Sequence, residues 1–108
     1  AEFLMAQFDV YRNPNKESAR RFPFLLDIQS GLLDRLATRV VVPLIAVNAG
    51  TAGVSTLNPE FELEGRRYLA LTQELAGVPA RGFGTPIASL AERRHEILAA
   101  LDVVVSGV

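Results

Sequence analysis

The sequence predicts a small, mainly β domain that ends in a single α-helix. Over residues 7–84, short apolar segments alternate with clusters of Gly, Pro and Asn, which is typical of strands joined by turns. Only the last twenty or so residues show apolar side chains at a helical period. A chain of 108 residues is long enough for one domain. We expect that domain to span residues 5–108, and we interpret residues 1–4, which precede Met5, as expression-tag residues.

The composition excludes several classes of function. The chain has 11 basic and 12 acidic side chains, one His, no Cys and no Trp. Without Cys there is no disulfide scaffold, thiolate metal site or cysteine nucleophile, and one His cannot build a multi-histidine site. The balanced charge argues against direct binding of nucleic acid by bulk basicity. No apolar stretch approaches the length of a membrane span and no signal peptide is evident, so we expect a cytoplasmic protein.

The first two strands are predicted on either side of a basic turn. Residues 7–11 (QFDVY) alternate polar and apolar side chains, and residues 24–30 (FLLDIQS) repeat that pattern before Gly31 ends the strand. Residues 13–15 (NPN) favour a turn. Residues 12–21 form the one locally basic stretch, which we interpret as a solvated hairpin tip rather than a contact for an acidic partner.

Two adjacent leucines and a third strand come next. Leu32 and Leu33 lie just outside the second strand, and the pattern alone favours both of them covering the core. Residues 39–45 (RVVVPLI) are nearly continuous in apolar and β-branched side chains, which predicts a strand covered on both faces. Pro43 cannot donate a backbone hydrogen bond, so it predicts an edge or a bulge there.

The middle of the chain is predicted as a loop followed by a hairpin. Residues 46–58 are small and contain Gly, which is typical of a loop. Residues 61–72 fit two strands turning at Glu64 and Gly65. Residues 66–76 are also rich in helix formers with apolar side chains at helical spacing, so periodicity leaves strand and helix open.

The last element is an amphipathic helix that follows a short extended stretch within residues 77–84. Two starts compete: Thr85 as N-cap with a proline behind it, or a capping box from Ser89 to Glu92. Gly107 is expected to end the helix in the left-handed conformation. One stripe of the predicted helix carries Ile87, Leu90, Ala91, Ile97, Leu98, Leu101 and Val105.

Residues that could perform chemistry are scarce. His95 lies on the predicted helix and is most simply a surface residue, and residues 82–84 (GFG) lack the third glycine of a nucleotide loop. Glu60, Glu62 and Glu64 alternate along one strand face, which is typical of a solvated sheet face more often than of a metal site. These residues point to no catalytic residue, no metal and no cofactor, and they leave open a binding protein or an enzyme whose site is not evident.

The order of short motifs resembles the CcdB toxins of bacterial toxin–antitoxin systems, from Met5 to the end of the chain. Each motif is weak alone, but together they keep the order and spacing of the family. The matching motifs are residues 7–11 (QFDVY), 27–30 (DIQS), 32–34 (LLD) and 39–44 (RVVVPL), followed by Leu57-x-Pro59, Thr72, Val78-Pro79 and the terminal Gly107-Val108.

The resemblance implies a fold and a mechanism. Family members are SH3-like β-barrels with a five-stranded antiparallel sheet, a small second sheet and a C-terminal helix, which favours a strand at residues 68–72. They are homodimers without enzymatic activity. They bind the A subunit of DNA gyrase and trap the cleaved-DNA complex, and a CcdA-like antitoxin neutralises them with its disordered C-terminal segment.

The resemblance also assigns a gyrase-binding surface. In a two-fold dimer the two helix ends can lie side by side and form one apolar patch. Val105 and Ser106 stand where family members carry Phe-Trp, and Asp102 stands where an Asn is familiar. Carried over by position, the surface consists of Leu32, Leu33, Asp102, Val105, Ser106, Gly107 and Val108.

Three alternatives remain beside this hypothesis. The same fold serves RNA-cleaving toxins of the MazF type, for which Thr38, Arg39 and residues 12–21 are the candidate RNA-binding positions. A non-toxic homologue that still binds an antitoxin would carry the same motifs. The terminal Gly107 could also do no more than end a helix.

Overall fold

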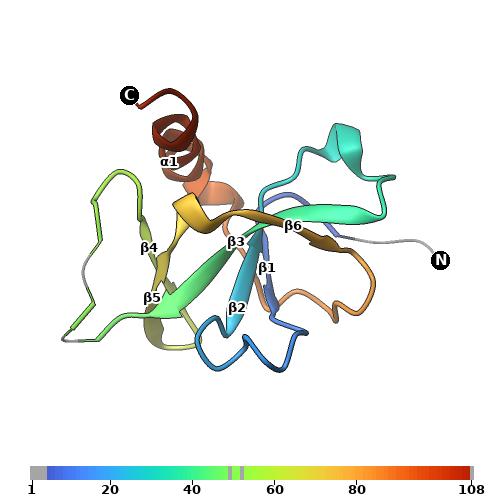
Figure 1. Cartoon of the computed structure of the whole chain (residues 1–108), viewed down its shortest axis with the longest axis horizontal. Coiled ribbons are helices and arrows are strands. Elements are labelled where there is room, and N and C mark those ends of the chain that lie inside the picture. Colours follow the sequence, from blue (N-terminus) through green and yellow to red (C-terminus); the bar gives the residue numbers. More distant parts are fainter. Residues whose placement is uncertain (1–4, 49, 52, 108) are drawn as a thin grey trace.

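The computed structural model describes residues 5–48, 50–51 and 53–107. The expected tag, residues 1–4, and the terminal Val108 of the predicted surface lie outside the described residues. Within the described part of the chain, seven antiparallel strands form one sheet in the order β4-β5-β3-β2-β1-β7, with β6 also paired to β3. The sheet curls into a nearly closed barrel with the helix α1 above it (Figure 1). This confirms the predicted mainly β, SH3-like barrel with one C-terminal helix.

The first two strands form the hairpin that the alternating patterns predict. β1 (Asp9–Arg12) pairs with β2 (Phe24–Asp27), and β7 (Ala88–Ser89) pairs with the outer side of β1. The side chain of Asn13 accepts the backbone N–H of Asn15 at 2.9 Å, so the predicted turn chemistry is used. Most residues of the basic tip are exposed or half-buried, as expected for a solvated loop.

The central strand β3 (Thr38–Ala46) joins the two parts of the sheet. β2 pairs with one edge of β3. Along the other edge, β6 (Ala76–Pro79) pairs with the first half of β3 and β5 (Arg66–Ala70) pairs with the second half. The small second sheet that the family resemblance implies is therefore not separate from the main sheet, because β5 and β6 both pair with β3. Pro43 lies between the part of β3 that pairs with β6 and the part that pairs with β5, since the first pairing ends at Val41 and the second begins at Leu44. Its missing N–H thus falls at a local edge within a central strand.

The hairpin between β4 (Glu60–Leu63) and β5 is confirmed, and the helical alternative for this segment is wrong. Glu64 and Gly65 both have positive φ, 51° and 79°, as a two-residue turn that matches the twist of its strands requires. The helix-forming residues beyond β5 form only one short turn, η2 (Thr72–Glu74). Pairing with β3 and β4 outweighs helix propensity here.

The C-terminal helix begins later than either predicted start. A short turn, η3 (Ala91–Arg93), leads into α1 (Arg94–Ser106). The preceding segment runs along β1: the N–H of Ile87 donates to the carbonyl of Val10 in β1, and that of Leu90 donates to the carbonyl of Phe8 just before β1, both at 2.8 Å. Ile87 therefore packs against the core from the barrel rather than from the helix.

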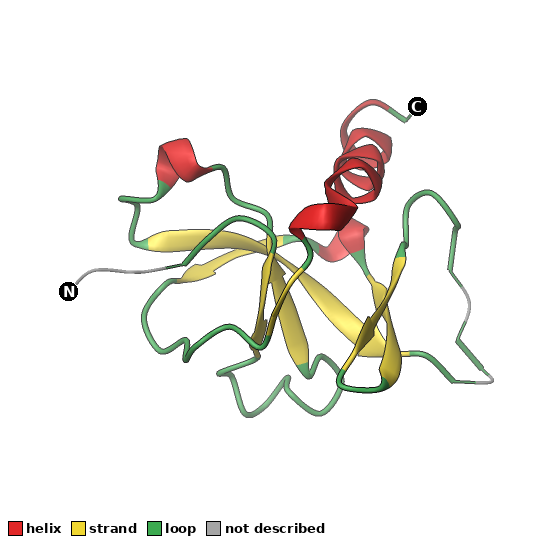
Figure 2. Cartoon of the chain, turned by 180° about the vertical axis from the view of Figure 1, so that it is seen from behind, coloured by secondary structure: helices red, strands yellow, loops and turns green. Residues whose placement is uncertain are grey.

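Side chains from both hairpins, from the approach to α1 and from the helix itself meet inside the barrel. Figure 2 shows the same arrangement from behind, with α1 above the sheet. None of the helices in the described ranges has the length and apolarity needed to cross a bilayer. The main core consists of Phe8, Val10, Phe24, Leu26, Val42, Leu44, Phe61, Leu63, Tyr68, Ala70, Leu90 and Ile97.

Candidate functional site

Two segments far apart in the sequence extend from the same side of the sheet. One is the loop of residues 28–37 between β2 and β3, which contains the short turn η1 (Gly31–Leu33), and the other is the end of α1. Both rise above the sheet in Figures 1 and 2, and they stand apart from each other in both views. The structure thus places the two predicted parts of the surface on one side of the molecule, but not next to each other within one chain.

The two leucines do not cover the core, so that part of the sequence interpretation is wrong. Leu32 is 95% exposed and Leu33 is 47% exposed. Leu36, at the far end of the same loop, is 48% exposed. The loop with η1 extends away from the barrel, and the buried positions beside it are taken by the polar side chains of Asp27, Gln29 and Arg39. We call residues 32–33 the leucine pair.

A buried arginine holds this loop to the barrel. The side chains of Arg39 on β3 and Asp27 on β2 are both 0% exposed. Arg39 donates to the Asp27 carboxylate from Nε at 2.9 Å and from Nη2 at 2.6 Å. It also donates from Nη1 to the half-exposed carboxylate of Asp34 at 3.0 Å. One guanidinium therefore joins two strands of the barrel to the residue that follows the leucine pair.

A buried glutamine makes a second connection to the same loop. The Gln29 side chain accepts the backbone N–H of Val40 at 2.9 Å and donates to the carbonyl of Leu33 at 2.8 Å. Its own N–H donates to the other oxygen of Asp27 at 2.9 Å. The residues Asp27, Gln29, Asp34 and Arg39 thus form one network, which we call the polar clamp. Among the described residues, no buried side-chain nitrogen or oxygen lacks a hydrogen-bond partner.

The clamp keeps its arginine charged. Burial lowers the pKa of the Arg39 guanidinium, but its hydrogen bonds to Asp34 and Asp27 and their charges raise it further, so that the net shift is upward. A buried cation of this kind depends on its carboxylate partners, because removing one leaves a desolvated charge.

The end of α1 has no comparable support. Its buried residues, Ile97 and Ala100, lie in the first half of the helix. Beyond them, Val105 is 83% exposed, so it does not belong to the core stripe that the sequence predicts. The other exposed stripe member is Ala91, which precedes α1.

The helix end itself has the predicted stop. Gly107 has φ 74°, in the left-handed region, and its N–H donates to the Val103 carbonyl at 3.0 Å. Asp102 and Ser106 are exposed, and the Ser106 hydroxyl donates to the Asp102 carbonyl at 2.8 Å. The last turn is therefore closed by local hydrogen bonds alone.

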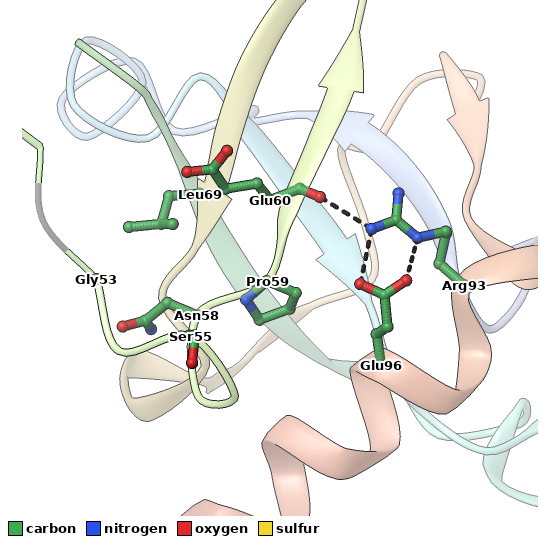
Figure 3. A pocket seen from close by; sticks show the side chains of 8 residues that line it. All are labelled: Gly53, Ser55, Asn58, Pro59, Glu60, Leu69, Arg93 and Glu96. Atoms are coloured by element: carbon green, nitrogen blue, oxygen red, sulfur yellow. Dashed lines mark hydrogen bonds and ion pairs between the residues drawn. The ribbon is translucent and has the colours of Figure 1, made fainter. Parts of the chain in front are cut away.

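The structure also contains a cavity of about 420 Å3 beside the root of α1, which the sequence analysis did not find (Figure 3). Arg93 faces it, but its guanidinium already donates to Glu96 and, at 3.1 Å, to the carbonyl of Glu60. Asn58 beside it is likewise satisfied by the Ala70 carbonyl at 3.0 Å. Arg93 and Asn58 are thus already hydrogen-bonded within the protein, and we interpret the cavity as part of the region where α1 attaches to the barrel.

The candidates for chemistry lie apart from one another. Glu60 and Glu64 pair with arginines at 3.6 and 2.8 Å, as expected of a solvated sheet face. In the part of the chain that the structure describes, no three acidic or histidine side chains are grouped as metal ligands would be. His95 is exposed, and Arg39 is fully buried, so Arg39 is wrong as an RNA-contacting candidate, although Thr38 beside it is exposed.

The sequence does contain one signal for the clamp. Arg39 directly precedes the apolar run of residues 40–46 in β3, so once it is buried its charge requires a carboxylate partner. Asp27 and Asp34 are the nearest acidic residues along the chain.

These features define the class of the protein: an SH3-like barrel with one C-terminal helix and exposed apolar groups on one side. Two solved structures share this fold. A toxin described only as from Mtb has a TM-score of 0.62 at 12% identity, covering 78% of this chain and 96% of its own. The Mycobacterium tuberculosis toxin MazF-mt6 has a TM-score of 0.61 at 14% identity, covering 76% of this chain and 84% of its own.

The sequence then identifies the family. The family model described as CcdB protein matches residues 7–107, nearly the whole chain, and the chain belongs to this family. Membership supports a toxin of a toxin–antitoxin system, and such a toxin has an antitoxin as its partner.

Proposed function

We propose that this toxin acts as a cytoplasmic homodimer that binds the A subunit of DNA gyrase, traps the cleaved-DNA complex and is neutralised by a CcdA-like antitoxin. The toxin itself performs no chemistry in this proposal. The gyrase-binding surface consists of Leu32, Leu33, Asp102, Val105, Ser106, Gly107 and Val108.

The observation that carries the proposal is the exposure of the leucine pair. A leucine that is 95% exposed contributes almost nothing to folding, whereas burying it against a partner is worth about 1.5–3 kcal/mol. The fold leaves Leu32 exposed at the position that the family resemblance assigns to gyrase. A partner that covers it gains this free energy, and the fold loses nothing by presenting it.

The helix end supports the same surface. Val105 is 83% exposed, and nothing lies within 4 Å of where a Cβ on Gly107 would be. A glycine with an open side lets the backbone of a partner approach closely. Two such ends brought together by a two-fold axis would present one continuous apolar surface.

A supercoiling assay with purified gyrase tests the proposal. We expect the wild type to inhibit supercoiling and to accumulate cleaved DNA, and Leu32→Ala or Val105→Ala to weaken both effects at least tenfold. Val54→Ala is the matched control, because Val54 is an exposed valine (61%) in the loop before β4. Equal potency of Val105→Ala, Leu32→Ala and wild type would contradict the assigned surface.

Deleting residues 107–108 isolates the helix end. We expect the truncated protein to fold and dimerise but to lose toxicity in growing cells. A truncated protein that remains fully toxic would show that the helix end is not the gyrase contact. If induction instead produces new, defined cleavage ends in cellular RNA, the endoribonuclease hypothesis replaces gyrase binding.

A further inference from the structure

The polar clamp extends from the core to Leu33, which belongs to the leucine pair, and to Asp34, which directly follows the pair. We propose that Asp34, Gln29 and Arg39 are positioning residues for gyrase binding: they hold residues 28–37 in the conformation that presents the leucine pair. This inference rests on the proposed function, because it concerns the same surface. Two of these residues, Gln29 and Arg39, are buried and cannot touch a partner, so they would set its affinity from inside the barrel.

Two side chains of the clamp hold the loop at consecutive residues, Leu33 and Asp34. Arg39 fixes the carboxylate of Asp34 at 3.0 Å, just after the pair, and Gln29 fixes the carbonyl of Leu33 at 2.8 Å, within it. Inside the loop, the Ser30 hydroxyl accepts the N–H of Leu32 at 3.2 Å. The backbone that carries both leucines is therefore fixed at three points, although the Leu32 side chain itself is almost fully exposed.

The arrangement fits positioning better than stability alone. A buried ion pair is often no more stabilising than apolar side chains of the same volume. The pair between Arg39 and Asp27 would by itself satisfy the core, yet the guanidinium also reaches out to Asp34, whose side chain is 50% exposed. This contact between Arg39 and Asp34, the outer arm of the clamp, orders the loop. A loop that is ordered before binding loses less conformational entropy when the partner covers it.

Asp34 is the residue to vary, because it belongs to the clamp without being buried. Asp34→Ala removes the outer arm and leaves Arg39 paired with Asp27. The matched control is Glu64→Asn, since the Glu64 side chain is 48% exposed and pairs with Arg12 at 2.8 Å. Asn tolerates the positive φ of 51° at that position, so the control loses a surface ion pair without backbone strain.

The first measurement is amide hydrogen exchange on the free protein. We expect exchange at the N–H of Leu33 and Asp34, which donate to the carbonyls of Ser30 and Gly31, to be at least tenfold faster in Asp34→Ala. Glu64→Asn should leave these rates unchanged. Unchanged exchange in Asp34→Ala would overturn the positioning role, and this measurement does not involve gyrase.

The second measurement is a double-mutant cycle on binding to the gyrase A subunit. We expect Asp34→Ala to weaken binding about tenfold in the wild type and less than twofold when Leu32 and Leu33 are already Ala. An equal loss in both backgrounds would mean that Asp34 touches gyrase directly, and no loss in either would mean that the clamp is only structural. Both results overturn the inference while gyrase binding stands, whereas a wild type that does not bind gyrase removes the proposed function itself.

Discussion

The two apolar segments of the proposed surface are held in place by different means. The leucine pair sits on a loop fixed by side chains from two strands, with the buried Arg39 at the centre of the polar clamp. The last turn of α1 is closed by its own hydrogen bonds, and Leu101 is the last helix residue that packs against the main core. One segment is thus ordered by tertiary contacts and the other by local structure.

This difference determines which substitutions reach each segment. Changes at buried positions distant from the surface should loosen the leucine pair, because the clamp connects it to the barrel. The helix end should respond only to changes in its own last turn or at the root of α1. Substitutions that damage one means of support at a time test this separation.

The largest effect is expected from removing the central carboxylate of the clamp. Asp27→Ala leaves Arg39 buried with only the half-exposed Asp34 as a partner, so we expect the free energy of unfolding to fall by about 3–5 kcal/mol. Urea unfolding followed by circular dichroism measures this loss.

A paired replacement separates stability from loop order. Asp27→Leu together with Arg39→Met exchanges the ion pair for apolar volume, and we expect most of the lost stability to return. The loop amides of Leu33 and Asp34 should nevertheless exchange quickly, because the arm to Asp34 is gone. If the paired variant protects these amides as well as the wild type does, the comparison between the two segments fails.

A smaller and strictly local effect is expected at the helix end. Gly107→Ala places a Cβ at φ 74°, which disfavours the left-handed stop by about 1 kcal/mol, although the surroundings are open. We expect faster exchange of the N–H of residue 107, which donates to the Val103 carbonyl, and no change at the leucine pair. Gly107→Asn is the control, since Asn tolerates this conformation better. Loosening of the leucine pair in Gly107→Ala would contradict the separation.

The same contrast explains what could be predicted from the sequence. The strands, the turn at Glu64 and Gly65 and the stop at Gly107 follow from local patterns, and each is confirmed. The exposure of Leu32 could not be predicted in this way. It depends on Arg39 and Asp27, which are 12 positions apart and meet only when β2 and β3 pair.

The start of the helix was missed for a related reason. Both predicted starts satisfy the capping rules, and Ser89 does accept the N–H of Ala91 at 3.3 Å. The preceding residues instead extend along β1, where the carbonyls of Phe8 and Val10 need donors. Long-range pairing thus overrode a local signal, while residues 94–106 became helical as their pattern predicts.

The smallest effect is expected at the root of α1, where pH should act on a single exposed pair. The hydrogen bond from Arg93 lowers the pKa of Glu96 below its ordinary value of 4.5, against a weak opposite effect of burial. A carboxyl whose pKa is lower in the folded state stabilises the fold above its unfolded pKa, and that stability is lost as the pH falls through the folded pKa. Because the Glu96 side chain is 50% exposed, we expect Glu96→Gln to lower the free energy of unfolding at pH 7 by only about 0.5 kcal/mol. Urea titrations should show the two proteins converging as the pH falls through the lowered pKa of Glu96, and the loss should shrink in 1 M salt. A difference that persists at low pH would mean that Glu96 supports the helix by packing rather than by its charge.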